Sequence, residues 1–262
     1  AWLILLAALT WREWSHLATR APVWLAGAPA SWRSLGRAER AICLLGAALL
    51  AFSLFQALTP PWDYDGLMYH LQGPRLFLQN GRITLLTDLW QANGPFTAEM
   101  LFTLGLAFGS DTFARLIHLS YTIAFVVGVW GLGARLVNRQ VGWIAAAVLM
   151  GQPIFPLWAS LAYIDIAWSL YEFLGLYGVM VWSGRGSRRL LVLAGLAIGW
   201  GMGCKYLGLG GAAVAGALVL WFSRRQTWRD VCANALLFGA PALLIALPWY
   251  LKNWIWAGNP VY

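Results

Sequence analysis

Two aspartates, Asp63 and Asp65, follow a pair of prolines, and Tyr69 and His70 come next along the chain. Asp65 and Tyr69 are four residues apart, so on a helix they would share one face. A carboxylate in such a setting can act as a general base toward an acceptor hydroxyl. Asp is also among the best helix-capping residues, and one cap would explain one of the two acids. Both roles stay open for Asp65, whereas His70 alone favours hydrogen bonding at the membrane interface.

Further ionisable side chains lie where apolar runs begin or end. Glu99 and Asp165 are predicted in the first turns of helices, where an acid favours the helix dipole. Glu172 lies inside an apolar run, where we expect a buried polar contact. Lys205 and Lys252 each allow two interpretations, because a lysine can snorkel to the interface or meet a phosphate at the headgroup level.

The composition is that of a membrane protein. Hydrophobic residues make up 60% of the 262 residues and charged residues only 11%, against about 25% charged residues in soluble domains. This excludes an ordinary soluble globule, a disordered chain and a nucleic-acid module. Cys43, Cys204 and Cys232 show no metal or disulfide spacing, so we expect them to be free and buried.

Apolar runs of about 20 residues are long enough to cross a bilayer. The sequence therefore predicts an all-α, polytopic transmembrane helix bundle. Its seven predicted spans are 41–59, 112–133, 141–159, 163–182, 190–204, 206–222 and 231–251. Ala1 to Trp11 is predicted to be the end of a truncated further helix, so residues 1–262 are interpreted as a single module of a longer protein. Gly195, Gly199 and Gly203 repeat every four residues, which favours close helix packing.

Basic residues predict the orientation, because cytoplasmic loops are rich in Lys and Arg. Thirteen of the 18 basic residues fall in alternate loops, which we place in the cytoplasm. They are Arg12, Arg20, Arg33, Arg37, Arg40, Arg135, Arg139, Arg185, Arg188, Arg189, Arg224, Arg225 and Arg229. Six of the ten acids lie on the opposite side, which predicts a functional face outside the cytoplasm of a protein of the plasma (inner) membrane.

The first extracytoplasmic loop, residues 60–111, carries most of the candidate site. We expect amphipathic juxtamembrane helices in it, the first kinked or divided at Pro74 and ended by Asn80-Gly81. Its apolar residues should face lipid: Leu67, Met68, Leu71 and Leu78. A second helix of about three turns, too short to span, should open near Pro95.

The segment Asp65-Gly66-Leu67-Met68-Tyr69-His70-Leu71 resembles the first outer loop of the C-type (GT-C) membrane glycosyltransferases. The likeness is to the bacterial branch similar to protein O-mannosyltransferases and aminoarabinose transferases, and it covers roughly residues 42–262. Further matches are Phe108-Gly109-Ser110 before Arg115, Tyr163-Ile164-Asp165, Lys205-Tyr206, and Pro248 to Asn253 with Gly258-Asn259-Pro260. Gly66 departs from the family, since many members carry Glu there.

The resemblance implies transfer of a sugar from a polyprenyl-phosphate donor to a lipid, glycan or protein acceptor, with inversion at the sugar. Asp65 would then be the general base and Lys205 the first choice for the donor phosphate, with Lys252 and Arg75 second. The other pocket residues would be Asp63, Tyr69, His70, Glu99 and Asp165. Asp63-Tyr64-Asp65 offers oxygens suited to Mg²⁺ or Mn²⁺, although two carboxylates alone define no metal site.

Two other classes remain. A transporter or flippase of lipid-linked sugars would also need intramembrane charges and broken helices, but the sequence shows no internal repeat of the kind common in transporters. In a non-catalytic membrane subunit, the acids would only cap helices.

Overall fold

The computed structural model describes residues 19, 30 and 32–262, so the predicted helix end at Ala1 to Trp11 lies outside the described residues. Within residues 32–262 every regular element is helical. The elements are α2 (Arg37–Ala57), the π-helix η1 (Gly66–His70), α3 (Gln72–Asn80), the 3-10 helix η2 (Trp90–Asn93), α4 (Thr97–Ala107), α5 (Asp111–Leu136), α6 (Arg139–Met150), α7 (Phe155–Ala159), α8 (Asp165–Arg185), α9 (Arg188–Cys204), α10 (Gly208–Ser223) and α11 (Trp228–Ala257).

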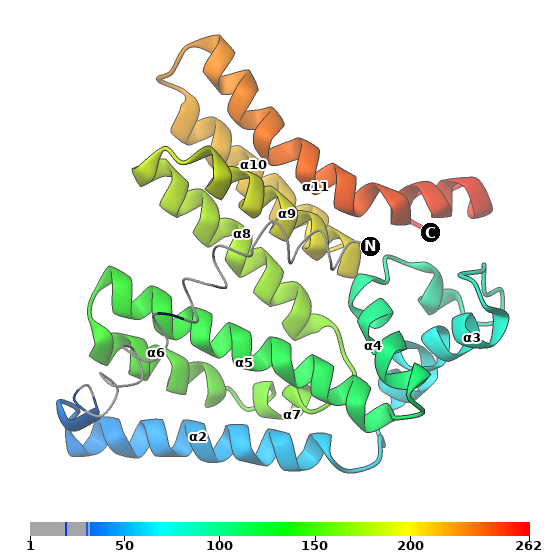
Figure 1. Ribbon diagram of the computed structural model, residues 1–262, viewed down its shortest axis with the longest axis horizontal. Helices are drawn as coiled ribbons and strands as arrows, with labels where there is room; N and C mark the ends of the chain where they lie inside the picture. The colour runs from blue at the N-terminus through cyan, green and yellow to red at the C-terminus, as the bar shows by residue number, and fades with distance from the viewer. Residues whose placement is uncertain (1–18, 20–29, 31) are drawn as a thin grey trace.

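The helices form two groups that are joined where α5 packs against α8 (Figure 1). One group contains α2, α5, α6 and α7, and the other contains α8 to α11. The groups spread apart at the left of Figure 1, where the turns between α5 and α6, α8 and α9, and α10 and α11 lie. At the right they meet the short elements of residues 60–111. We call these the basic end and the acid end.

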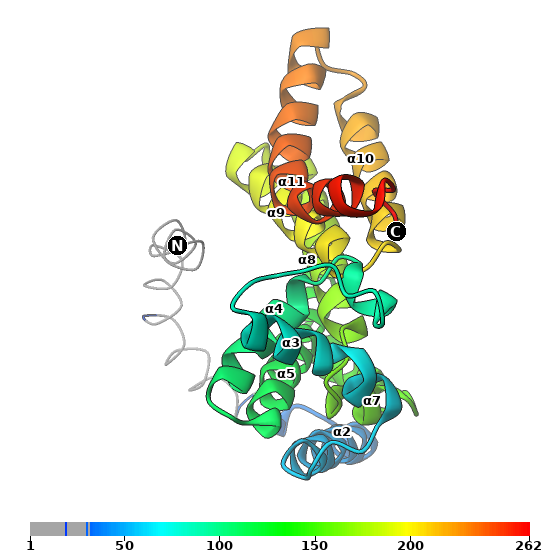
Figure 2. The same ribbon diagram turned by 90° about the vertical axis from the view of Figure 1, so that its right-hand side faces the viewer.

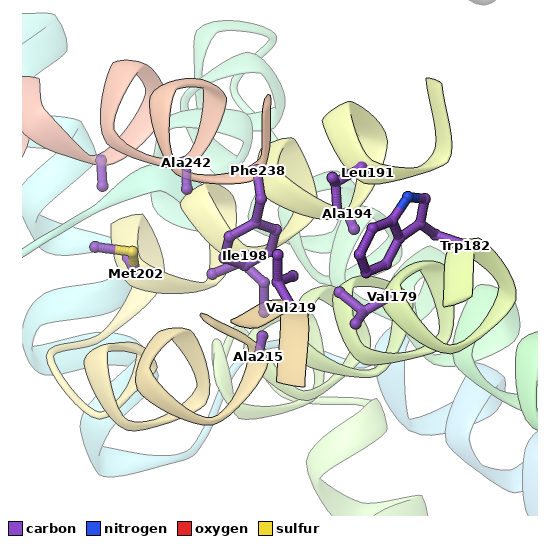
Figure 3. Close-up of a cluster of buried hydrophobic side chains, with 11 residues drawn as sticks. Val179, Trp182, Leu191, Ala194, Ile198, Met202, Ala215, Val219, Phe238 and Ala242 are labelled. Atoms are coloured by element: carbon purple, nitrogen blue, oxygen red, sulfur yellow. The ribbon is translucent and has the colours of Figure 1, made fainter. Parts of the chain in front are cut away.

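The main core lies between α8, α9, α10 and α11, with α9 in the centre (Figure 3). Ile198 of α9 is 1% exposed and packs among Val179, Val219 and Phe238 from the other three helices. Gly195 and Gly199 face the main chain of α11, and a Cβ atom at either position would overlap it. The predicted packing role of these two glycines is therefore confirmed.

Within residues 32–262, three helices are long and apolar enough to cross a membrane: α2, α5 and α11. Their 21 to 30 residues correspond to about 32–45 Å, more than the roughly 30 Å of the hydrocarbon core. The all-helical fold and these three helices support the interpretation as a membrane protein. The three cysteines are free, as expected. Cys43 and Cys204 are buried, whereas Cys232 is only partly buried.

One predicted span is wrong as a continuous helix. Residues 141–159 are divided into α6, which ends at Met150, and α7, which begins at Phe155. Pro153 lies in the turn between them, and proline has no N–H for the helix ladder and clashes with the preceding turn. The mean hydropathy of this segment does not reveal the break between the two helices, because the residues on both sides of it are apolar. The prolines of α11, Pro241 and Pro248, are instead inside the helix, and Figure 2 shows its last turns, in red, running across the direction of the first.

The loop 60–111 corrects two further expectations. The first helix is divided at Leu71, between η1 and α3, and not at Pro74, which lies in the first turn of α3 where no N–H is needed. Leu71 is fully buried, so it does not face lipid. The predicted stop is confirmed, because Gly81 ends α3 in the left-handed conformation with φ of 65°. The second short helix is α4, as expected.

Candidate functional site

The two aspartates of the first loop have different surroundings. Asp63 is 4% exposed, and its Oδ1 accepts a hydrogen bond of 2.7 Å from the backbone N–H of Gly66. It therefore supplies the cap at the start of η1. Within the described chain, the half-buried Asp65 carboxylate makes no capping hydrogen bond. Of the two acids, Asp63 is therefore the one that caps η1.

Gly66 explains how Asp63 comes so close to the main chain. A Cβ atom at position 66 would overlap the Asp63 carboxylate. The next residues form the π-helix η1, closed by a hydrogen bond of 2.9 Å from Leu71 N–H to the Gly66 carbonyl. Single π-turns are rare and often occur at functional sites. The glycine that departs from the glycosyltransferase pattern is thus required by the local fold.

His70 ends η1 and forms a buried pair with Glu99 in the first turn of α4. The His70 Nδ1 and Glu99 Oε1 atoms are 2.8 Å apart, and the side chains are 3% and 1% exposed. Burial raises the pKa of the Glu99 carboxyl, although the hydrogen bond with His70 opposes this rise. His70 therefore makes a hydrogen bond, as predicted, but inside the protein and not at its surface. The pair fixes η1 to α4 from inside the protein.

Tyr69 lies near three carboxylates that come from different parts of the sequence, those of Asp65, Glu99 and Asp165. Its ring packs on His70 with centroids 4.1 Å apart. Burial raises the pKa of the Tyr69 hydroxyl, and the charges of Asp65, Glu99 and Asp165 raise it further. Tyr69 is therefore a neutral hydrogen-bonding group at physiological pH, next to Asp65.

Lys205 follows α9 and pairs with Asp165 at the start of α8. The Nζ to Oδ1 distance is 2.9 Å, and the two side chains are 41% and 21% exposed. The ammonium also lies 5.9 Å from the ring centre of Trp168. Lys205 thus has a carboxylate partner rather than only snorkelling to the interface, and it stays accessible at the acid end.

The second-choice cations hold structural elements together. The Lys252 ammonium donates a 2.6 Å hydrogen bond to the Asn93 carbonyl and lies over the rings of Trp249 and Trp256. Arg75 pairs with Asp111, which joins α3 to the start of α5. The structure brings together Asp65, Tyr69, His70, Glu99 and Asp165 with Lys205, whereas Arg75 and Lys252 have other partners.

Two buried residues of α5 were not among the predicted site residues. Arg115 is fully buried and donates to the carbonyls of Gln56, Thr59 and Ser160, at the ends of α2 and α7. His118 is also fully buried, and among the described residues its ring nitrogens have no hydrogen-bond partner of good geometry. Both are ionisable residues inside a predicted span, which is the signal that could have singled them out.

The carboxylates offer no built metal site. Among residues 32–262, no group of three or more His, Cys, Asp or Glu side chains lies close enough to hold a metal ion. The Asp63 Oδ1 atom is already used by the Gly66 N–H. The residues present therefore do not fit the Mg²⁺ or Mn²⁺ that Asp63-Tyr64-Asp65 suggested.

In comparisons with known proteins, no family model, curated protein or solved structure matches this chain.

Proposed function

We propose that this chain is the membrane part of a glycosyltransferase that moves a sugar from a polyprenyl-phosphate donor to an acceptor outside the cytoplasm. The observation that carries the proposal is the division of roles between two neighbouring acids. Asp63 is buried and caps η1, which leaves the half-buried Asp65 carboxylate free of that role, beside Tyr69. The resemblance of this segment to the GT-C first outer loop supports the same assignment.

The proposal includes seven membrane crossings, formed by α2, α5, α6 with α7, α8, α9, α10 and α11. Figure 1 supports this because successive helices run alternately toward the basic end and the acid end. The arginine-rich turns share one end and would be cytoplasmic. The acid end would then face outward from the plasma (inner) membrane, where the lipid-linked donor and the acceptor meet. The sugar donor and the surrounding membrane lipids are the proposed partners, with no role for nucleic acid.

In the proposed reaction, Asp65 accepts the proton of the acceptor hydroxyl as its oxygen attacks the anomeric carbon. The bond between that carbon and the phosphate oxygen breaks, and its electron pair leaves with the polyprenyl phosphate. Lys205 stabilises the charge that develops on the phosphate. Asp165 holds the ammonium in position, and the donor phosphate competes with it for Lys205. Attack opposite the leaving group inverts the sugar.

The buried pair His70 and Glu99 acts as positioning machinery. It fixes the last residue of η1 to α4, and Asp65 directly precedes the first residue of η1. The pair therefore sets the direction of the general base without touching the reacting atoms in this proposal.

Transport of a lipid-linked sugar is the second candidate, and two observations favour it. Transporters commonly contain broken helices, and α6 and α7 are such a pair. Glu172 of α8 also has a buried carboxylate oxygen with no hydrogen-bond partner among the described residues. A transporter would move the donor across the membrane without breaking the bond between sugar and phosphate.

One experiment separates the two functions. The protein that contains this chain is reconstituted in vesicles with a panel of polyprenyl phosphates that carry radiolabelled hexoses or pentoses, together with acceptor-containing membrane extract. The transferase proposal predicts free polyprenyl phosphate and label in a new product. Label that crosses the bilayer while it stays attached to polyprenyl phosphate would contradict the proposal and support transport.

A further inference from the structure

A cavity of about 370 Å³ lies away from the acid end, between α8, α9 and the last turn of α5. Its size is within the range of roughly 300–1,000 Å³ that ligand pockets occupy. Most of its wall is apolar or aromatic. Two arginines also line it, Arg135 of α5 and Arg185 of α8.

The cavity extends from the basic end toward the middle of the bundle. Arg185 ends α8 and Tyr171 lies 14 residues earlier on the same helix, which corresponds to about 21 Å. Tyr171 and Trp200, with ring centroids 5.6 Å apart, mark its inner end. One half of the hydrocarbon core is roughly 15 Å thick. The cavity therefore has the length of one leaflet together with its headgroup layer.

The charge at the outer end of the cavity is positive and unopposed. Arg135 and Arg185 are both exposed, and in the part of the chain that the structure describes no Asp or Glu lines this cavity. Arg135 donates a 3.1 Å hydrogen bond to the Tyr177 hydroxyl, which holds the guanidinium over the cavity wall. An anionic group at this depth would meet two arginines, and an apolar chain attached to it would lie along the wall.

We infer that this cavity binds an anionic glycerophospholipid of the leaflet at the basic end, with its phosphate against Arg135 and Arg185 and one acyl chain along α8 and α9. The inference goes beyond the proposed sugar transfer, which concerns the opposite end. The lipid would lie against α8 and α9, on the side to which the last turn of α5 contributes Arg135. It also joins α5 to α8 and α9, next to the Tyr121 and Tyr171 hydroxyls, which are 2.9 Å apart.

A second cavity at the same end gives an internal contrast. Its volume is about 210 Å³, and polar side chains that include Asp230 and Asn234 line it. The carboxylate of Asp230 disfavours a lipid phosphate there. The two cavities therefore differ in the chemistry that an anionic lipid requires, because two arginines and no acid line the first, whereas Arg188 and Asp230 line the second.

The test is native mass spectrometry of the detergent-purified protein, titrated with phosphatidylglycerol or phosphatidylcholine. The double variant Arg135→Ala/Arg185→Ala is compared with Arg225→Ala/Arg229→Ala, which removes the same charge from exposed positions of the same end. Each Lys or Arg near an anionic lipid contributes about fivefold in affinity, so the cavity variant should bind phosphatidylglycerol roughly 25-fold more weakly. The control variant should bind it nearly as wild type does.

Leu193→Trp tests the apolar part, since Leu193 lines the cavity and is 43% exposed. It should reduce retention of both lipids without a loss of charge. Equal affinity for the two lipids in wild type, or equal losses in the two double variants, would overturn the inference. If inorganic phosphate alone displaced the lipid, binding of an acyl chain in the cavity would be contradicted. If the protein were a dimer and only the cavity variants made it dissociate, the cavity would instead bind a second copy of the chain, which would also overturn the inference.

Discussion

The two ends of the bundle use charge in different ways. At the acid end, ionisable side chains from separate elements contact one another: His70 with Glu99, Asp165 with Lys205, and Arg75 with Asp111. At the basic end, arginines bond mainly to nearby main chain. Arg40 donates to the Arg33 carbonyl and Arg224 to the Trp221 carbonyl, and all four residues are at least partly exposed.

The charged side chains of the acid end therefore hold elements of the fold together, whereas those of the basic end are largely solvated. A buried charged group without its partner costs several kcal/mol, whereas surface substitutions usually change stability by less than about 0.5 kcal/mol. Substitutions at the acid end should therefore alter folding or catalysis. At the basic end they should alter orientation and lipid contacts.

The largest expected difference between the two ends is the side of the membrane on which they lie: the acid end outside the cytoplasm and the basic end in it. Single cysteines are introduced at Asn80 and at Ser187 in a background without Cys43, Cys204 and Cys232. An impermeant thiol reagent added to intact cells should label position 80 and leave position 187 unlabelled until the membrane is opened. Labelling of both positions from outside would refute the proposed topology.

Substitution of an arginine at each end of α5 should give the largest difference in stability between the two ends of the bundle. Arg115→Ala leaves three main-chain carbonyls of α2 and α7 without their buried donor. We expect a loss of about 3–5 kcal/mol, measured as a fall in melting temperature or in the yield of monodisperse protein. Arg135→Ala is the matched control, because Arg135 is exposed in the last turn of the helix. Similar melting temperatures for the two variants would contradict the contrast between the ends.

Gly66→Ala should disturb the start of η1. The added methyl group would overlap the Asp63 carboxylate and displace the cap, with an expected cost of about 1–3 kcal/mol. Gly131→Ala is the control within α5, since nothing lies within 4 Å of its added Cβ atom. If thermal unfolding shows Gly66→Ala to be as stable as Gly131→Ala, the cap by Asp63 is not important for folding.

Lys205 should give a smaller effect that is confined to the donor. Lys205→Ala is expected to weaken binding of a polyprenyl-phosphate sugar by about tenfold, since hydrogen bonds to charged groups contribute about 1.5 kcal/mol or more. Lys205→Arg should keep part of the affinity, because charge matters more than shape at a point contact. Isothermal titration with detergent-solubilised donor measures both. Unchanged affinity in a folded Lys205→Ala protein would leave only the pairing with Asp165.

Much of the helical architecture could be predicted from local signals. The apolar run after Ser110 predicted α5, and Asn80-Gly81 predicted the end of α3, because capping and hydropathy act within a few residues. The break at Pro153 was also local, but the apolar residues around it concealed it in a search for long hydrophobic runs.

The contacts of the acid end could not be predicted from the sequence. His70 and Glu99 are 29 residues apart, and Asp165 and Lys205 are 40 apart, with no periodicity that links either pair. Their pairing depends on how α4, α8 and α9 meet in three dimensions. The sequence alone also did not decide which of Asp63 and Asp65 caps η1, because both acids precede it and either could cap it. The hydrogen bond from Gly66 N–H to Asp63 decides this.

In the proposed mechanism Asp65, and not its neighbour Asp63, removes the proton from the acceptor. The most direct measurement compares sugar transfer by Asp65→Asn and Asp63→Asn in membranes with equal amounts of folded protein. Asn caps helices about as well as Asp, so both variants should keep a melting temperature close to that of wild type. Transfer should fall by about 10²-fold or more in Asp65→Asn, as expected for loss of a general base, and much less in Asp63→Asn. Near-normal turnover by Asp65→Asn would contradict the account.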